Sequence, residues 1–385
     1  MLCEAAYRLG ITPIVLAERA ADSAAQLCPS AVFGSTQDPA ALHTLFTQVP
    51  AVIFENEFVA RPVLEQAARN TAVRFLPGLD AVEFVQDKSR QKLLLQRLGI
   101  ATSPFRIFEG TAGDIGEWVN EEFSAGSIPP VFKWSTLGYD GKGTWLGDAR
   151  AEAVAFCRQA VRQKKGVYRE ARVDFRRELA IVAVRSTRGE FTTYPLVISQ
   201  QKGGICRLVT GPARALGVSE RLEQEAQTAA RRIAEDLDLV GCFALEFFET
   251  QKGELWVNEL APRVHNSGHY TQNASSTSQF ENHLRAVLGL PLGATTCTGA
   301  FAMLNLLGPE SVHAQWEAEP QNLPLPIPHA AQHLHWYAKG RASPGRKLGH
   351  LNCVVAEVSA LPQAVRELEE VVAAWHAQLS TGALS

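Results

Sequence analysis

The chain has 385 residues, of which 46% are hydrophobic and 20% charged, a composition typical of a globular protein with room for two or three domains. Its formal net charge of −3 gives no indication of nucleic-acid or anionic-membrane binding, so any phosphate site must depend on a local basic cluster. No apolar run reaches transmembrane length, and Glu4 and Arg8 interrupt the N-terminus, unlike in a signal peptide. The seven cysteines are scattered without metal spacing, which indicates reduced thiols and a cytoplasmic location.

The first segment, residues 1–86, alternates helical and strand patterns. Its first ten residues predict a helix that stops at Gly10, TPIVLAE and PAVIFENE predict buried strands, and ALHTLF and PVLEQAAR predict helices. This alternation predicts a small parallel-sheet domain. Because such a unit normally opens with a strand and a glycine-rich turn, we expect this domain to lack its first strand.

Three further segments follow along the chain. Residues 87–170 begin with a basic amphipathic helix, DKSRQKLLLQRLG, and contain the glycine-rich loop LGYDGKG. Residues 171–300 predict the strands ELAIVAVR, FTTYPLVI, CFALEFF and ELWVNEL, and one strong helix after Ser219. Residues from about 301 to 385 predict the strands AFAMLNLLG and HLNCVVAEV and a last helix after Pro362.

The glycine-rich loop contains Tyr139, Asp140 and Lys142. Its glycines allow a backbone to approach an anion closely, and Lys142 adds positive charge. Taken alone, the loop is better interpreted as a β-hairpin, since Asp140-Gly141 is a strong turn signal. Lys133 precedes the loop in the apolar strand PPVFKWS, where an unpaired ammonium is costly to bury; this favours a contact with nucleotide phosphates, although the side chain could also extend to solvent.

Four carboxylates occupy strand positions. Glu170 and Glu178 flank a strand start, where a carboxylate can accept hydrogen bonds from ribose hydroxyls, but the pattern alone favours exposed charges at a strand edge. Glu246 and Glu259 each interrupt an apolar strand, where ionised carboxylates are rare unless they are paired or metal-bound. Two hard oxygen ligands on neighbouring strands favour Mg²⁺ that bridges phosphates, with a salt bridge to Arg263 as the alternative.

The segment NELAPRVHNSGHYT, residues 258–271, gathers an amide, a carboxylate, a guanidinium and two imidazoles where a strand runs into a loop. Proteins of the α/β class commonly bind ligands at such a strand end. His265 and His269 have the spacing of a helical zinc site, but Pro262 and Gly268 disfavour a regular helix, so we reject zinc. A histidine near phosphates is better interpreted as a proton carrier or an anion contact.

A second basic segment, HLHWYAKGRASPGRKLGH, spans residues 333–350. It holds Lys339, Arg341, Arg346 and Lys347 around glycines and a proline, and such a cationic loop is a candidate phosphate site. A solvated basic loop is the alternative interpretation. The glycines on both sides of Arg346 favour ligand binding.

Taken together, these segments resemble the ATP-grasp superfamily, and more closely the N5-carboxyaminoimidazole ribonucleotide synthetase (PurK) family of purine biosynthesis. The resemblance covers nearly the whole chain and rests on GYDGKG, NELAPRVHNSGHYTQNASSTSQFENHLRAVLGLPLG and HWYAKGRASPGRKLGH, in that family's order. It implies an α/β (α+β) ATP-grasp fold with an N-terminal Rossmann-like (pre-ATP-grasp) domain. The implied parts are this domain at 1–86, a linker helix and ATP lid at 87–170, the ATP-grasp domain at 171–300, and a C-terminal portion with a substrate-phosphate loop at 301–385.

The resemblance implies ATP- and bicarbonate-dependent carboxylation of 5-aminoimidazole ribonucleotide through carboxyphosphate, with ATP and Mg²⁺ and in a homodimer. The positions that match the family's ATP and metal contacts are Lys88, Lys133, Glu170, Glu178, Asn258, Glu246 and Glu259, the last two as magnesium ligands. Those that match its ribonucleotide contacts are Tyr139, Asp140, Lys142, Arg263, His265, Lys339 and Arg346. Lys339 and Arg346 are expected to take the 5′-phosphate, and His265 or Asp140 the proton of the attacking amine.

The chain departs from the family pattern in two places. It lacks the opening strand and glycine-rich turn, and ISQQKGGI stands where many relatives carry a histidine-containing segment. Gln200 and Gln201 of that segment cannot carry protons, which bears on the substrate more than on ATP. The competing functions are another ATP-grasp reaction, such as formate-dependent glycinamide ribonucleotide transformylation, and a nucleotide-binding protein without catalysis.

Overall fold

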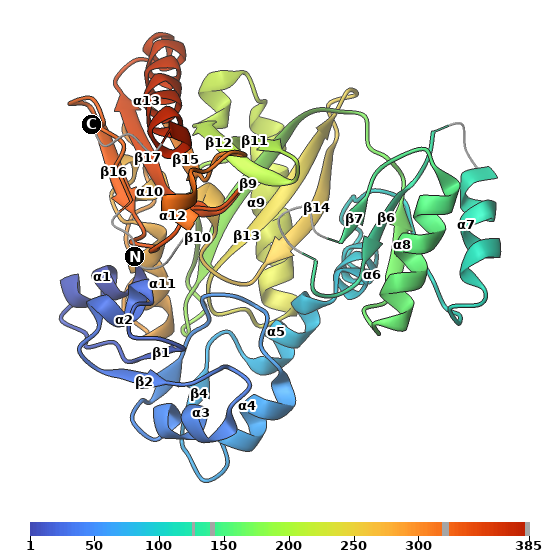
Figure 1. Cartoon of the computed structure of the whole chain (residues 1–385), viewed down its shortest axis with the longest axis horizontal. Coiled ribbons are helices and arrows are strands. Elements are labelled where there is room, and N and C mark those ends of the chain that lie inside the picture. Colours follow the sequence, from blue (N-terminus) through green and yellow to red (C-terminus); the bar gives the residue numbers. More distant parts are fainter. Residues whose placement is uncertain (125–127, 139–142, 318–322, 382–385) are drawn as a thin grey trace.

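The computed structural model of the chain describes residues 1–124, 128–138, 143–317 and 323–381 (Figure 1). A large antiparallel sheet forms the centre, a small unit of N-terminal residues lies below it in the view, and a four-stranded unit projects to one side. The predicted loop residues Tyr139, Asp140 and Lys142 lie outside the described residues.

Short helices and parallel strands alternate in the N-terminal unit, as the sequence predicts. The strands form two separate pairs, β1 with β2 and β3 with β4, and no strand within the described residues joins the pairs. Leu42, Phe46 and Leu64 pack in the core of this unit. Its elements are α1 (Leu2–Arg8), β1 (Val15–Ala17), α2 (Ser23–Leu27), β2 (Ala31–Phe33), α3 (Pro39–Phe46), β3 (Ala51–Val52), α4 (Arg61–Ala67), β4 (Arg74–Phe75) and α5 (Leu79–Gln86).

The predicted basic helix is α6 (Lys88–Arg97), and it leads into the projecting unit. Asp87 fixes its start, because the carboxylate accepts hydrogen bonds from the backbone N–H groups of Ser89 and Arg90. The projecting unit has strand order β5-β8-β6-β7, and two helices pack on it through Trp118 and Cys157. Its elements are β5 (Phe105–Ile107), α7 (Ile115–Ser124), β6 (Val131–Trp134), β7 (Thr144–Trp145), α8 (Arg150–Arg162) and β8 (Val167–Glu170).

The central sheet has the order β14-β13-β9-β11-β12-β15-β17-β16, with β10 also paired to β9, and every pairing is antiparallel. It combines strands from the segments 171–300 and 301–385. Its strands are β9 (Phe175–Arg185), β10 (Phe191–Thr193), β11 (Val197–Lys202), β12 (Ile205–Gly211), β13 (Gly241–Thr250), β14 (Leu255–Ala261), β15 (Ala300–Leu307), β16 (Gln332–Trp336) and β17 (Lys347–Val355). The single strand predicted for FTTYPLVI is wrong: the segment is divided into β10 and β11 at Pro195, which has no N–H for the ladder.

Helices cover the central sheet on both faces. The predicted helix after Ser219 packs one apolar face against β9 and β13, and α11 covers the opposite face together with α1. The last helix buries Leu368 and Trp375 against β15 and β17 and begins at Leu361, one residue before Pro362. The helical elements here are η1 (Ala213–Leu216), α9 (Glu220–Asp236), η2 (Asn266–Gly268), α10 (Thr271–Ala274), α11 (Gln279–Val287), α12 (Ala314–Glu317), η3 (Val358–Ala360) and α13 (Leu361–Thr381).

Two further properties concern the whole molecule. Within the described parts of the chain, none of the helices has the length and apolar character that crossing a bilayer requires. All seven cysteines carry free thiols.

Gln91 fastens α6 to the central sheet. Its amide nitrogen donates to the carbonyl oxygens of Val85 and Leu260 at 2.7 and 3.2 Å, and its amide oxygen accepts from the Leu260 N–H at 2.9 Å. The side chain is only 5% exposed, so water cannot replace these bonds. Gln91 therefore holds the helix that carries Lys88 against the strand that carries Glu259.

Replacement of Gln91 by leucine is expected to lower the free energy of unfolding by about 2 kcal/mol, because it leaves the buried polar backbone groups of Leu260 without partners. The midpoint and slope of urea unfolding measure this change. Gln96→Leu, at an exposed position of the same helix, is the control. Equal destabilisation by the two substitutions would contradict the assignment.

Candidate active site

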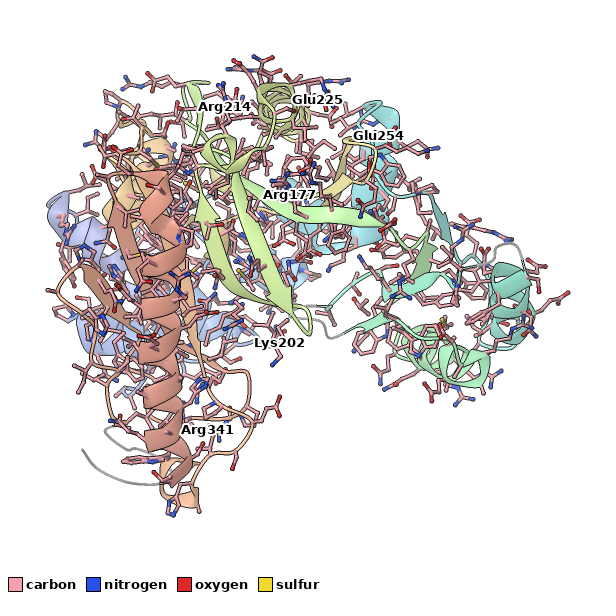
Figure 2. All side chains as sticks on the ribbon, turned by 90° about the horizontal axis from the view of Figure 1, so that it is seen from above. Arg177, Lys202, Arg214, Glu225, Glu254 and Arg341 are labelled. Carbon is pink, nitrogen blue, oxygen red and sulfur yellow. The ribbon has the colours of Figure 1, made fainter. Side chains whose placement is uncertain are left out.

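A cavity of about 800 Å³ lies between the projecting unit and the central sheet. Its wall includes the described residues Gly138 and Thr144, which flank the predicted glycine-rich loop. Figure 2 shows Lys202, at the turn between β11 and β12, on the side of the sheet that faces the projecting unit. The predicted site residues that line the cavity are Lys88, Lys133, Glu170, Glu178, Glu246, Asn258, Glu259, Arg263 and His265.

Three carboxylates come from adjacent strands of the central sheet. Glu246 of β13 and Glu259 of β14 are direct partners across the antiparallel pair, and Glu178 of β9 lies diagonally beside Glu246. Leu245 and Phe247 pack in the core under α9. Because successive side chains of a strand point to opposite faces, Glu246 points away from α9 and into the cavity.

A β-bulge lets two consecutive residues of β14 reach this cavity. Glu246 pairs with Glu259 and Phe247 pairs with Val257, so Asn258 is the extra residue between the two pairs. In a regular strand Asn258 and Glu259 would face opposite sides of the sheet. The bulge places both at the cavity wall, as bulges often do beside active sites.

Lysines from outside the sheet neutralise these acids. The Lys88 ammonium, from the first turn of α6, lies 2.5 Å from Glu259 Oε2. Lys133 of β6 forms an ion pair with Glu170 and donates to Asn258 Oδ1 at 3.2 Å, so its side chain does not extend to solvent. The expectation of an exposed Glu170 is wrong, because this residue is 3% exposed.

The carboxylates differ in how easily they ionise. Burial, together with the neighbouring carboxylates of Glu259 and Glu178, raises the pKa of Glu246 to about 7. Burial also opposes ionisation of Glu259, but the adjacent Lys88 ammonium prevails and lowers the pKa of Glu259 to about 2. Of the two facing carboxylates, Glu259 therefore ionises readily and Glu246 does not.

Arg263 pairs with Glu57 of the N-terminal unit instead of with the strand carboxylates. The guanidinium Nε donates to Glu57 Oε2 at 2.6 Å. This contact replaces the alternative in which Arg263 neutralises Glu246 or Glu259. It also brings the N-terminal unit into the cavity wall, which Glu57 lines.

The two histidines of the segment 258–271 have different surroundings. Nε2 of His265 lies 3.6 Å from Glu246 Oε1, and its Nδ1 accepts from the Ser267 N–H at 3.3 Å. Burial, with the positive charges of Arg263 and Lys347, lowers the pKa of His265 to about 3, so the ring is neutral near pH 7. The His269 ring is buried beside the ring of His350, with centroids 4.9 Å apart.

The structure does not bring Lys339 and Arg346 to the cavity wall. Lys339 Nζ donates to the carbonyl oxygen of Lys347 at 2.8 Å, and Arg346 donates to the carbonyl oxygen of Arg341 at 3.2 Å. Lys347, at the start of β17, is the residue of this basic segment that lines the cavity. The predicted basic loop thus connects β16 to β17, and its last residues lie beside the cavity at Lys347.

Sequence reasoning missed Glu57 and Lys92 as residues of this region. Glu57 lies in FENE at the end of a predicted strand, and its acidic character was the available signal. Lys92 lies within a basic helix, where a lysine is ordinarily solvated, so the sequence offers no signal for its burial beside Glu170.

Three family models match consecutive parts of the chain. Residues 1–86 match the ribonucleotide synthetase preATP-grasp domain, 93–280 the ATP-grasp domain, and 302–364 the phosphoribosylaminoimidazole carboxylase C-terminal domain. The chain is therefore an ATP-grasp ligase in fold and class.

Relatives define the family more narrowly. The chain is 38% identical to the N5-carboxyaminoimidazole ribonucleotide synthase of Synechococcus elongatus, over 97% of this chain and 92% of the relative. It is 37% identical to that of Mycobacterium tuberculosis strain H37Rv, over 97% and 84%. The chain belongs to the N5-carboxyaminoimidazole ribonucleotide synthase family.

Solved structures agree with this assignment. The N5-carboxyaminoimidazole ribonucleotide synthetase of Thermus thermophilus superposes with a TM-score of 0.81 at 36% identity, covering 96% of this chain and 95% of that one. The Aspergillus clavatus enzyme complexed with ATP gives 0.82 at 30% identity, covering 97% and 95%. The same enzyme complexed with ADP and 5-aminoimidazole ribonucleotide gives 0.81 at 29% identity, also covering 97% and 95%. The predicted fold is thereby confirmed.

The free energy of unfolding of the wild type is expected to fall as pH rises, and replacement of Glu246 by glutamine is expected to abolish this fall. The folded-state pKa of about 7 lies above the ordinary value of 4.5, so between these values the folded state binds more protons than the unfolded state. The wild-type free energy of unfolding therefore falls through this window, and Glu246→Gln should gain relative stability of up to a few kcal/mol toward its upper end.

Urea unfolding across this window, without divalent cations, measures the difference. Glu254→Gln, at an exposed position in the same β13–β14 hairpin, should follow the wild type. A constant difference between wild type and Glu246→Gln across the window would contradict the raised pKa.

Proposed function

We propose that the chain catalyses the ATP- and bicarbonate-dependent carboxylation of 5-aminoimidazole ribonucleotide to N5-carboxyaminoimidazole ribonucleotide in purine biosynthesis. Family membership supports this activity, as do relatives solved with ATP and with ADP and 5-aminoimidazole ribonucleotide. The observation that carries the proposal is the pair of facing carboxylates, Glu246 and Glu259, in a cavity that also holds Lys88 and Lys133.

The facing carboxylates fit a divalent cation. Glu246 resists ionisation because it is buried and because Glu259 beside it is charged, and a cation between them would relieve that repulsion. Carboxylate oxygens are the ligands that Mg²⁺ prefers, and Mg²⁺ usually completes its shell with water and phosphate oxygens. Glu246 and Glu259 would hold the ion, with the Asn258 amide beside them. When bound, Mg²⁺ neutralises charge on the transferring phosphoryl group.

The remaining residues of the cavity suit ATP. We assign Lys88 and Lys133 to the phosphates, where their ammonium groups offset charge that develops during phosphoryl transfer. Glu170 at the end of β8 and Glu178 on β9 are assigned to the adenine and ribose side, respectively. We also propose that the chain divides into four functional parts, with boundaries at residues 86, 170 and 300. ATP is assigned to the space between the projecting unit and the central sheet.

The reaction follows from the weak electrophilicity of bicarbonate. A bicarbonate oxygen attacks the γ-phosphorus of ATP, ADP leaves, and carboxyphosphate breaks down to CO₂ and phosphate. The exocyclic amine of the ribonucleotide then forms an N–C bond to CO₂ and loses a proton, for which His265 and Asp140 are the candidate acceptors. A closed cavity protects carboxyphosphate from water.

The ribonucleotide is assigned to the side of the cavity near Arg263, His265 and the basic segment. Tyr139, Asp140 and Lys142, which lie outside the described residues, are assigned to contacts with the ribonucleotide. Lys339 and Arg346 are assigned to its 5′-phosphate. This assignment requires the loop between β16 and β17 to move toward the part of the cavity wall that Lys347 lines. We also propose that the chain acts as a cytoplasmic homodimer.

ADP release should depend on both 5-aminoimidazole ribonucleotide and bicarbonate, and Glu259→Gln should lower kcat on the order of 100-fold, because it removes a charged ligand of the Mg²⁺ that would neutralise the transferring phosphoryl group. A coupled assay for ADP measures both effects. The exposed variant Glu254→Gln should keep wild-type kcat. Dependence on formate and glycinamide ribonucleotide would favour the transformylase alternative, and ATP binding without turnover would favour the non-catalytic one.

Arg346→Met should raise the KM for the ribonucleotide about tenfold or more and leave the KM for ATP unchanged, because a charge-assisted phosphate contact is lost. Arg341, labelled in Figure 2, is an exposed arginine of the same loop. Steady-state kinetics of Arg341→Met supply the control. Equal effects of the two substitutions would remove Arg346 from the phosphate site.

A further inference from the structure

Lys92 of α6 is a buried ammonium that does not line the cavity. Its side chain is 1% exposed, and Nζ lies 2.9 Å from Glu170 Oε2. The same nitrogen donates to the hydroxyls of Thr102 and Ser103 at 2.7 and 3.1 Å. A charge buried so completely is rare unless its partners compensate it, so the arrangement calls for a physical reason.

The Glu170 carboxylate is shared between two ammonium groups. Oε1 pairs with Lys133, whereas Oε2 pairs with Lys92 and accepts from the Ser103 hydroxyl at 2.6 Å. Lys133 lines the cavity and Lys92 does not. One buried carboxylate therefore joins a lysine that can reach a ligand to a lysine that cannot.

Lys92 is held where it is by its surroundings. Its helix is fastened to β14 by Gln91, and Thr102 in turn donates to the Val257 carbonyl oxygen at 2.6 Å. The other nearby ammonium, that of Lys88, is engaged by Glu259. Lys92 is thus the cation that stays beside Glu170 whatever Lys133 does.

We propose that Lys92 is a positioning residue for ATP binding: it remains the counter-ion of Glu170 when Lys133 turns from Glu170 toward the phosphates of ATP. The inference rests on the proposed function, because it assigns Lys133 to those phosphates. Without Lys92, that movement would leave a buried carboxylate with no cation, which is strongly unfavourable. Lys133 would then stay with Glu170, and ATP would bind less tightly.

The test is a double-mutant cycle read as the Kd for ATP by calorimetry in the presence of Mg²⁺. Lys92→Met keeps the side-chain length and removes the charge, and it should weaken ATP binding about tenfold or more. In the Glu170→Gln background no carboxylate needs a counter-ion, so Lys92→Met should then change the Kd little. Lys252→Met, at an exposed turn position, is the control for the exchange of lysine for methionine.

Kinetics separate this role from a general structural one. At saturating ATP, Lys92→Met should keep most of the wild-type kcat while its KM for ATP rises. An unchanged Kd for ATP in Lys92→Met overturns the proposal, and so does an equal loss in the wild-type and Glu170→Gln backgrounds. If the single variant Lys92→Met fails to fold, the Kd of Glu170→Gln is compared with that of the double variant. A higher Kd for ATP in the double variant overturns the proposal.

Failure of the proposed function is distinguishable from failure of this inference. A wild-type protein that binds ATP but does not carboxylate 5-aminoimidazole ribonucleotide refutes the proposed reaction and leaves the cycle on ATP affinity intact. A wild-type protein that carboxylates the ribonucleotide, but whose ATP affinity does not depend on Lys92, refutes only the positioning role.

Discussion

The burial of carboxylates against lysine ammonium groups is the constraint on which the site depends. Glu170 is buried and the Glu259 side chain is 32% exposed, and each stays ionised because a lysine from another element lies against it. Lys88 reaches Glu259 from α6, and Lys133 reaches Glu170 within the projecting unit. In the proposed function a triphosphate competes for these lysines, so ATP binding would be an exchange of ionic partners.

The central sheet supplies the rigidity that this exchange requires. Adjacent antiparallel strands fix Glu178, Glu246 and Glu259 on one face, and the bulge at Asn258 adds an amide to the same wall. The opposite face is packed under α9, so the carboxylates cannot move apart without disturbing the core. The lysines have long, flexible side chains and lie on elements outside the sheet, so their ammonium groups can change from a carboxylate to a phosphate partner.

Much of this arrangement could be predicted from the sequence. The strands that carry Glu246 and Glu259 follow from apolar runs, and charged residues within such runs indicate pairing or a ligand. The register that makes them direct partners could not be predicted, because it depends on a one-residue bulge that no local pattern encodes. The pairing of Arg263 with Glu57 is likewise a contact between segments about two hundred residues apart in sequence, which only the fold brings together.

The contact between Arg263 and Glu57 has a consequence for selectivity. An incoming anion gains the guanidinium only by displacing a carboxylate that already holds it at 2.6 Å, so the net gain is a difference between two similar attractions. Chloride and other weakly basic monoanions gain almost nothing from such a swap, whereas a ligand with greater charge or several hydrogen-bond acceptors does. The resident Glu57 thus favours multiply charged ligands over monoanions such as chloride at this guanidinium.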